Sequence, residues 1–313
     1  MELYPLIEPN DSGMLEVGDD NFIYWEVGGN PNGKPALVVH GGPGSGAGHG
    51  SWRYFDPEYF RIIFFDQRGC GRSRPHASDP KTDMSANTTH HLVADMEKLR
   101  VHLRINSWLL YGGSWGSTLI LAYAERFPDR VSEIVIVSVT MSRPSEIEWL
   151  YRGVSRFLPK QWARFHGFAN SDDIVGAYAQ LMENPNLEVR QQAAAEWVLW
   201  EDAVIEHEST GSPGSYGARV DEARLAFVRI CAHYFSHGAW LEEGELLQSA
   251  YRLSGIPGVL IHGRLDLGSP LQTAWELQQA WKSAELVIID DAGHTGSNAA
   301  RGAVFAAIER FKR

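Results

Sequence analysis

Apolar positions divide most of the chain into short buried strands and longer amphipathic helices. Short apolar runs, typical of strands buried on both faces, occur at residues 36–39, 61–65, 108–111, 131–137, 258–261 and 285–289. Helical spacing predicts helices that start near Thr88 and helices over 118–127, 271–280 and 299–311. Residues 14–27 alternate as a β-hairpin does, with its turn at 18–20. This order predicts an α/β protein with a mostly parallel central sheet and helices on both faces.

The middle of the chain follows a different pattern. Residues 141–250 lack strand-like runs, are rich in Trp, Glu and Arg, and contain a Gly/Ser/Pro loop at 209–217. We therefore expect an inserted helical cap over 141–250 and a core domain built from 1–140 and 251–313. Ligands of open α/β sheets bind at the carboxyl ends of the strands, so the cap is expected to act as a lid over that edge.

Composition narrows the possible partners and the cellular location. The 313 residues carry a formal charge of −11 without any Lys/Arg run, which argues against a nucleic-acid partner. Two cysteines without CxxC spacing favour a reducing compartment. The N-terminus shows no signal-peptide pattern, and no apolar run is long enough for a membrane span. We expect a soluble, cytoplasmic protein with no membrane partner.

A candidate nucleophile lies in a G-x-S-x-G motif. Residues 112–116 place Ser114 between a predicted strand and a predicted helix, which is the setting of a nucleophile elbow. Glycines on both sides allow a sharp turn without Cβ clashes. The serine hydroxyl would then project above the sheet, beside the free N–H groups at the start of the helix.

Two further side chains fit a catalytic triad with Ser114. Asp266 and His294 each follow one of the last two predicted strands, and the chain order Ser, Asp, His is the order that accompanies this elbow. His294 would take the serine proton and pass it to the leaving group, while Asp266 would fix the imidazole tautomer. Asp66 is the alternative acid, but it precedes Ser114 in the chain.

A glycine-rich loop supplies the last part of the predicted machinery. Residues 40–44 read HGGPG and follow a predicted strand. Backbone N–H groups of Gly42 and of Trp115, the residue after the nucleophile, are the expected oxyanion-hole donors. No H-E-x-x-H, P-loop or strand-linked G-x-G-x-x-G pattern is found, so neither a metal nor a cofactor is expected.

Over nearly its whole length the chain resembles the proline iminopeptidases, or prolyl aminopeptidases. The resemblance rests on residues 40–44, 66–73, 87–89, 112–117 and 262–266 and, within the expected cap, on Arg143, residues 146–147, Trp149, Tyr151 and residues 197–201. It implies the α/β-hydrolase fold and a serine aminopeptidase that removes N-terminal proline from peptides. The implied substrate is a small peptide or a related amide or ester.

The resemblance also implies a substrate site in the cap. In the family, the glutamate at the position of Glu201 helps to hold the substrate's ammonium group, and a carboxylate under a dry lid suits that role. The further substrate contacts that we expect from the family motifs are Trp200, Arg143, Tyr151 and Cys231. Cys231 departs from the family pattern, because it stands where the family carries a second glutamate.

Two alternatives to the aminopeptidase remain open at this point. Because Cys231 is neutral, the protein could be a related esterase or amidase that acts on small non-peptide substrates. A catalytically silent binding protein on the same fold is the other alternative, and the complete set of triad residues argues against it.

Overall fold

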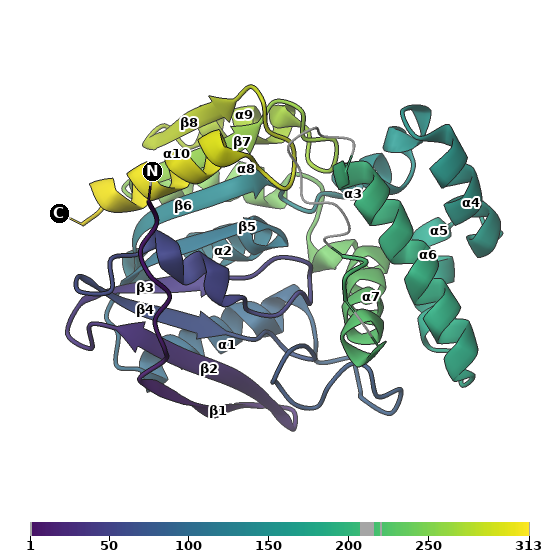
Figure 1. Cartoon of the computed structure of the whole chain (residues 1–313), viewed down its shortest axis with the longest axis horizontal. Coiled ribbons are helices and arrows are strands. Elements are labelled where there is room, and N and C mark those ends of the chain that lie inside the picture. Colours follow the sequence, from purple (N-terminus) through teal and green to yellow (C-terminus); the bar gives the residue numbers. More distant parts are fainter. Residues whose placement is uncertain (1, 207–215, 220, 313) are drawn as a thin grey trace.

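The computed structural model describes residues 2–206, 216–219 and 221–312 (Figure 1). The predicted loop at 209–217 therefore lies mostly outside the described residues. Within them the chain forms one eight-stranded sheet with the order β1-β2-β4-β3-β5-β6-β7-β8. Its strands are β1 (Asp11–Gly18), β2 (Asn21–Gly29), β3 (Lys34–Val39), β4 (Phe60–Phe65), β5 (Trp108–Ser114), β6 (Val131–Val139), β7 (Gly258–Gly263) and β8 (Ala284–Ile289).

The sheet is parallel except at one edge. β1 and β2 form the expected hairpin, and β2 pairs antiparallel with β4, whereas all pairs from β4 to β8 are parallel. Helices cover both faces. One face carries α1 (Thr89–His102), α2 (Trp115–Arg126), α8 (Glu245–Ser249) and α9 (Leu271–Ala280), and the other carries the short 3-10 helix η1 (His49–Tyr54) and α10 (Asn298–Arg310). The predicted fold class is confirmed.

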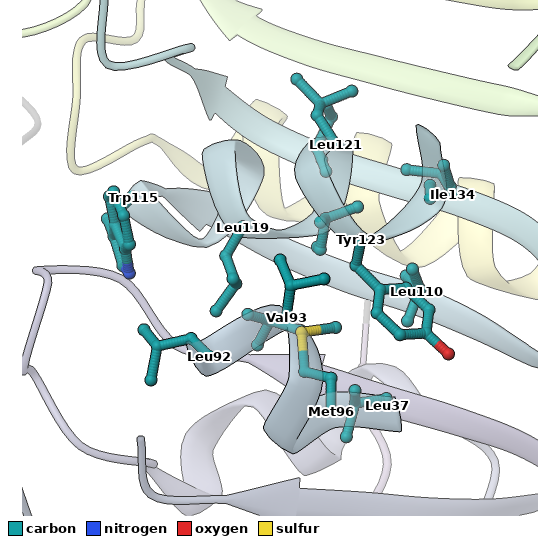
Figure 2. Close-up of a cluster of buried hydrophobic side chains, with 14 of the residues drawn as sticks. Leu37, Leu92, Val93, Met96, Leu110, Trp115, Leu119, Leu121, Tyr123 and Ile134 are labelled. Atoms are coloured by element: carbon teal, nitrogen blue, oxygen red, sulfur yellow. The ribbon is translucent and has the colours of Figure 1, made fainter. Parts of the chain in front are cut away.

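Successive residues of the buried strands pack on opposite faces, which gives the core two layers. In β3, Leu37 belongs to the apolar cluster with α1 and α2, and Val38 belongs to the cluster with η1 and α10. Figure 2 shows the first cluster, with Met96 of α1 and Leu119 of α2 among the side chains packed near Leu37. Burial on both faces explains why these strands are continuous apolar runs without alternation.

The G-x-S-x-G segment is more regular than the sequence suggested. β5 continues through Gly112 and Gly113 to Ser114, and α2 begins at once with Trp115 instead of near Thr118. The glycines allow this because a Cβ on Gly112 would lie 2.5 Å from the carbonyl oxygen of Val39 in β3. The strand can therefore stay close to its neighbour until the nucleophile position.

A helical insertion follows β6, as expected. It comprises α3 (Pro144–Tyr151), α4 (Pro159–Ala169), α5 (Ile174–Met182), α6 (Leu187–Glu206) and α7 (Asp221–Ser236). These helices bury an aromatic-rich cluster of their own, and they lie at the end of the sheet toward which β6 points (Figure 1). The described helices include none with the length and apolarity that a membrane span requires.

Candidate active site

Ser114, Asp266 and His294 meet at the carboxyl edge of the sheet. Ser114 ends β5, Asp266 follows β7 and His294 follows β8. The Nε2 atom of His294 lies 3.1 Å from the Oγ atom of Ser114. Its Nδ1 atom lies 3.0 Å from each carboxylate oxygen of Asp266. Three residues far apart in the sequence thus form a continuous hydroxyl–imidazole–carboxylate chain.

Ser114 adopts a strained backbone conformation that directs its hydroxyl away from the sheet. Its φ is 54° and its ψ is −130°, a region that residues with a Cβ seldom occupy. The following glycine makes the turn possible, because a Cβ on Gly116 would lie 2.5 Å from the carbonyl oxygen of Val39. Strain held by the surrounding packing at a nucleophile is a common feature of catalytic sites.

The protonation pattern of this chain follows from the environment of Asp266. Burial opposes its ionisation, but the nearby His294 and a hydrogen bond from the Ser269 backbone N–H at 2.8 Å bring the pKa of the carboxyl below its ordinary value. The ionised carboxylate can only accept hydrogen bonds, so Nδ1 of His294 carries the proton. Nε2, 3.1 Å from the Ser114 Oγ atom, is then unprotonated and can accept the proton of that hydroxyl.

A second histidine, His262, supports the acid. Its Nδ1 accepts a hydrogen bond from the Val139 N–H at 3.0 Å, and its Nε2–H donates to the Ser269 carbonyl at 2.7 Å. Burial lowers its pKa, and its Nε2 lies 3.8 Å from Asp266. A neutral His262 therefore fixes the Asp266 loop to the end of β6. Sequence reasoning assigned it no role, although its position four residues before Asp266 was the available signal.

The two expected oxyanion-hole residues are joined by Gln67. Its side-chain N–H donates to the His40 carbonyl at 2.9 Å, and its Oε1 atom accepts from the indole N–H of Trp115 at 3.0 Å. The Gln67 backbone N–H donates to Nε2 of His40 at 3.0 Å. Gly42 has a φ of 117°, where a Cβ would lie 2.6 Å from the Gly44 nitrogen. Gln67 thus holds the loop that carries Gly42 in a fixed position relative to Trp115.

Asp66, the alternative acid, has a different structural role. Its carboxylate accepts hydrogen bonds from the Ala47 N–H at 2.7 Å and from the Arg72 N–H and Nε–H at 2.9 and 2.8 Å. These bonds fasten the segment after the glycine-rich loop to the segment after β4. The carboxylate next to His294 is that of Asp266, so the chain-order argument selected the correct neighbour.

A small cavity opens above Ser114, between the core and the cap. The centre of a water-sized sphere can occupy about 60 Å³ of it. Core residues and cap helices both contribute to its wall. The described residues that line it are Gly42, Ser114, Trp115, Thr140, Ser142, Glu146, Ile147, Leu150, Glu201, Ile205, Tyr216, Phe235, Gly268, Ser269 and His294.

Glu201 is a buried carboxylate in this wall, and its hydrogen-bond donors among the described residues are both neutral. The Tyr151 hydroxyl donates to it at 2.6 Å, and the Trp197 indole N–H donates at 2.9 Å. Burial raises its pKa to about 7. The other lining carboxylate, Glu146, already binds a cation, because the Arg143 guanidinium lies 3.1 Å from it. Of the two, Glu201 is the carboxylate still available to a cationic group.

The other four expected substrate contacts do not line the cavity. Tyr151 stands behind Glu201 and orients it. Trp200 stacks on Phe165 in the cap core, and Arg143 pairs with Glu146 and Glu276 at the start of α3. Cys231 is fully buried, and its thiol donates to the Pro43 carbonyl. Their places in the family motifs reflect packing and loop positioning in this structure, not exposure to the cavity.

Comparison with known proteins agrees with this architecture. A family profile described as the α/β hydrolase fold matches residues 34–297. Among solved structures, an α/β hydrolase from a deep-sea metagenome library superimposes with a TM-score of 0.61 at 16% identity, covering 96% of both chains. A proline iminopeptidase-related protein from Thermus thermophilus gives a TM-score of 0.56 at 22% identity, covering 96% of this chain and 97% of that chain. The fold and the profile thus place the protein among the α/β hydrolases.

Curated relatives narrow this class. A probable proline iminopeptidase from Streptomyces coelicolor is 46% identical, covering 100% of this chain and 98% of that protein. The proline iminopeptidases of Neisseria gonorrhoeae and Arabidopsis thaliana are 43% and 40% identical, covering 93% and 94% of this chain and 93% and 78% of those proteins. The chain belongs to the proline iminopeptidase family of serine hydrolases.

Proposed function

We propose that this enzyme releases N-terminal proline, or another small N-terminal residue, from peptides through an acyl-enzyme. The observation that carries the proposal is the pairing of two features at one cavity, namely a nucleophile aligned with its base and a buried carboxylate that forms no ion pair with any described side chain. A cavity this small favours a compact N-terminal residue. Relatives that carry this activity in their names support the same assignment.

In the proposed reaction, the Ser114 hydroxyl oxygen attacks the carbonyl carbon while His294 takes the proton. The N–H groups of Gly42 and Trp115 stabilise the negative oxygen of the tetrahedral intermediate. The C–N bond then breaks, and His294 gives its proton to the leaving amine. Water repeats the sequence on the ester, which restores Ser114 and releases the free residue.

Glu201 is proposed to hold the substrate's ammonium group. An ammonium ion entering the cavity would give this carboxylate a directly bonded cation, which no described side chain provides, and the low-polarity surroundings would strengthen the pair. Tyr151 and Trp197 would keep the carboxylate oriented. We also propose that the insertion expected at 141–250, between core segments 1–140 and 251–313, acts as the substrate lid through α3 to α7, whereas α8 at its end packs on the sheet with the core helices.

The proposal can be tested by comparing three substrates and one variant. Proline arylamide should be hydrolysed with a kcat/KM well above that of N-acetylproline arylamide, which lacks the ammonium group. Ser114→Ala should abolish arylamide turnover and labelling by a fluorophosphonate probe. Turnover of a simple aryl ester without arylamide turnover would instead identify an esterase, and an unlabelled parent enzyme would identify a binding protein.

A further inference from the structure

A second cavity adjoins the catalytic imidazole on the side of the glycine-rich loop. It has a volume of about 320 Å³ and lies between the segment from Gly41 to Gly48, η1, and the loop and helix that follow β8. His294 lines this cavity as well as the cavity that contains Glu201. The residue that is proposed to protonate the leaving amine therefore borders both spaces.

The described lining of the second cavity carries a positive charge, although the protein as a whole is acidic. Among the described residues that line it, Arg301 is the only arginine or lysine, and no carboxylate is present. Arg301 is exposed in α10, and no described side chain forms an ion pair with it. By contrast, Arg310 of the same helix pairs with Glu285 at 2.6 Å. In a chain of net charge −11, an exposed guanidinium that lines a cavity and has no ion-pair partner among the described residues is a candidate anion site.

The chemistry of acyl transfer indicates which part of a peptide would occupy this cavity. The leaving nitrogen must come within hydrogen-bond reach of Nε2 of His294 to take its proton. The ammonium end of the substrate lies toward Glu201, so the leaving segment extends from the imidazole in another direction. In a short peptide that segment ends in a carboxylate, which a guanidinium can bind through two parallel hydrogen bonds.

We infer that the second cavity binds the leaving segment and that Arg301 pairs with the C-terminal carboxylate of short peptides. This inference rests on the proposed function and makes it more specific. The preferred substrates would be dipeptides and tripeptides with a free C-terminus. Peptide amides and arylamides, which lack the carboxylate, would gain nothing from Arg301.

Arg301→Gln tests the inference when free peptides and their amides are compared. Prolyl dipeptides and tripeptides are assayed as free acids and as C-terminal amides, with proline arylamide as a reference. For the dipeptide or the tripeptide, the parent should hydrolyse the free acid with a higher kcat/KM than the amide. Arg301→Gln should remove that preference by lowering kcat/KM for the free acid about 3- to 10-fold, mainly by raising KM. Arg301→Glu should reverse the preference. The arylamide should be unaffected, and Arg310→Gln serves as the matched control on the same helix.

The outcomes separate this inference from the function on which it rests. A parent enzyme that hydrolyses proline arylamide but shows the same acid-to-amide ratio as Arg301→Gln would overturn the carboxylate site and leave the aminopeptidase intact. An equal loss on acids, amides and arylamide would assign Arg301 a structural role, which also overturns the inference. A parent enzyme without arylamide turnover would defeat both proposals.

Discussion

Two buried carboxylates belong to the same site but differ in what surrounds them. Asp266, from the core, has His294 as its neighbour, and its pKa is lowered despite burial. Glu201, from the cap, has a hydroxyl and an indole N–H as its hydrogen-bond partners within the described part of the chain, and burial raises its pKa to about 7. The charged groups that act on Glu201 at longer range, Arg219 and Asp202, have opposite effects.

The different surroundings suit the two carboxylates to different roles. The core carboxylate is paired with His294, so it stays ionised and keeps the imidazole proton on Nδ1, which is the tautomer that the proposed mechanism requires. The cap carboxylate has no directly bonded cation among the described residues, so under the proposed function its charge is favoured most when a substrate supplies one. Pairs of titratable groups whose surroundings separate their pKa values are a general way to assign different roles to similar side chains.

The largest expected effect comes from Asp266→Asn. The asparagine NH₂ group would donate toward Nδ1 of His294 and force the proton onto Nε2, where it faces Ser114 and blocks proton transfer. We expect kcat to fall by about 10³- to 10⁴-fold for arylamides and aryl esters alike. Steady-state kinetics on both substrates provide the measurement, with Asp290→Asn, an exposed neighbour paired with Arg264, as the control. A loss of less than tenfold would mean that Asp266 does not set the tautomer.

The isosteric change in the cap, Glu201→Gln, should have a smaller and more selective effect. Losing one charged partner of an ammonium group corresponds to a loss of about 10- to 100-fold in kcat/KM for proline arylamide. An aryl ester without an amine should be hydrolysed at close to the parent rate. Glu196→Gln, on the same helix and paired with Arg164 on the surface, is the matched control. Equal losses on both substrates would show that Glu201 supports the site without reading the amine.

The pH dependence of kcat/KM for the arylamide and the ester should further distinguish the role of Glu201 from that of Asp266. Because the pKa of Glu201 is raised to about 7, its charged form is lost as the pH falls through that value. The ratio of arylamide to ester kcat/KM should therefore fall by up to about tenfold between pH 8 and pH 6. Taking the ratio cancels any pH dependence of the acyl-transfer step that both substrates share. In Glu201→Gln the ratio should be flat, and a sloping ratio there would assign the titration to another group.

The core was more predictable than the cap for physical reasons. Strands buried on both faces leave short apolar runs, and α9 begins and ends at the expected residues, 271 and 280. Triad positions follow from chain order and strand ends. The residues that sequence reasoning missed, Gln67 and His262, act through long-range contacts to Trp115 and Val139 that no local pattern encodes.

In the cap, residue identity alone gave little guidance about exposure. Without the family resemblance, Glu201 would have been placed on a solvated helix face, the usual location of a glutamate. A local signal was present, because Trp197 stands four residues earlier on the same face of α6 and donates to it. Cys231 shows the opposite case, since its motif position suggested a substrate contact but its thiol packs against the glycine-rich loop.

The smallest expected effect concerns stability. Glu201→Gln and Asp266→Asn should change the free energy of unfolding in opposite directions. For Glu201 the folded pKa of about 7 exceeds the ordinary value of 4.5, so its ionisation costs stability as the pH rises through that window. Glu201→Gln should therefore raise the free energy of unfolding at pH 8, by on the order of 1 kcal/mol, with the gain fading toward pH 4.5. Asp266 has a lowered pKa and contributes stability above its unfolded pKa that is lost as the pH falls through its folded value, so Asp266→Asn should lower the free energy of unfolding at pH 8. Denaturant unfolding of both variants at pH 8 and pH 5 checks these signs, and a destabilised Glu201→Gln at pH 8 would show that its carboxylate is already compensated within the protein.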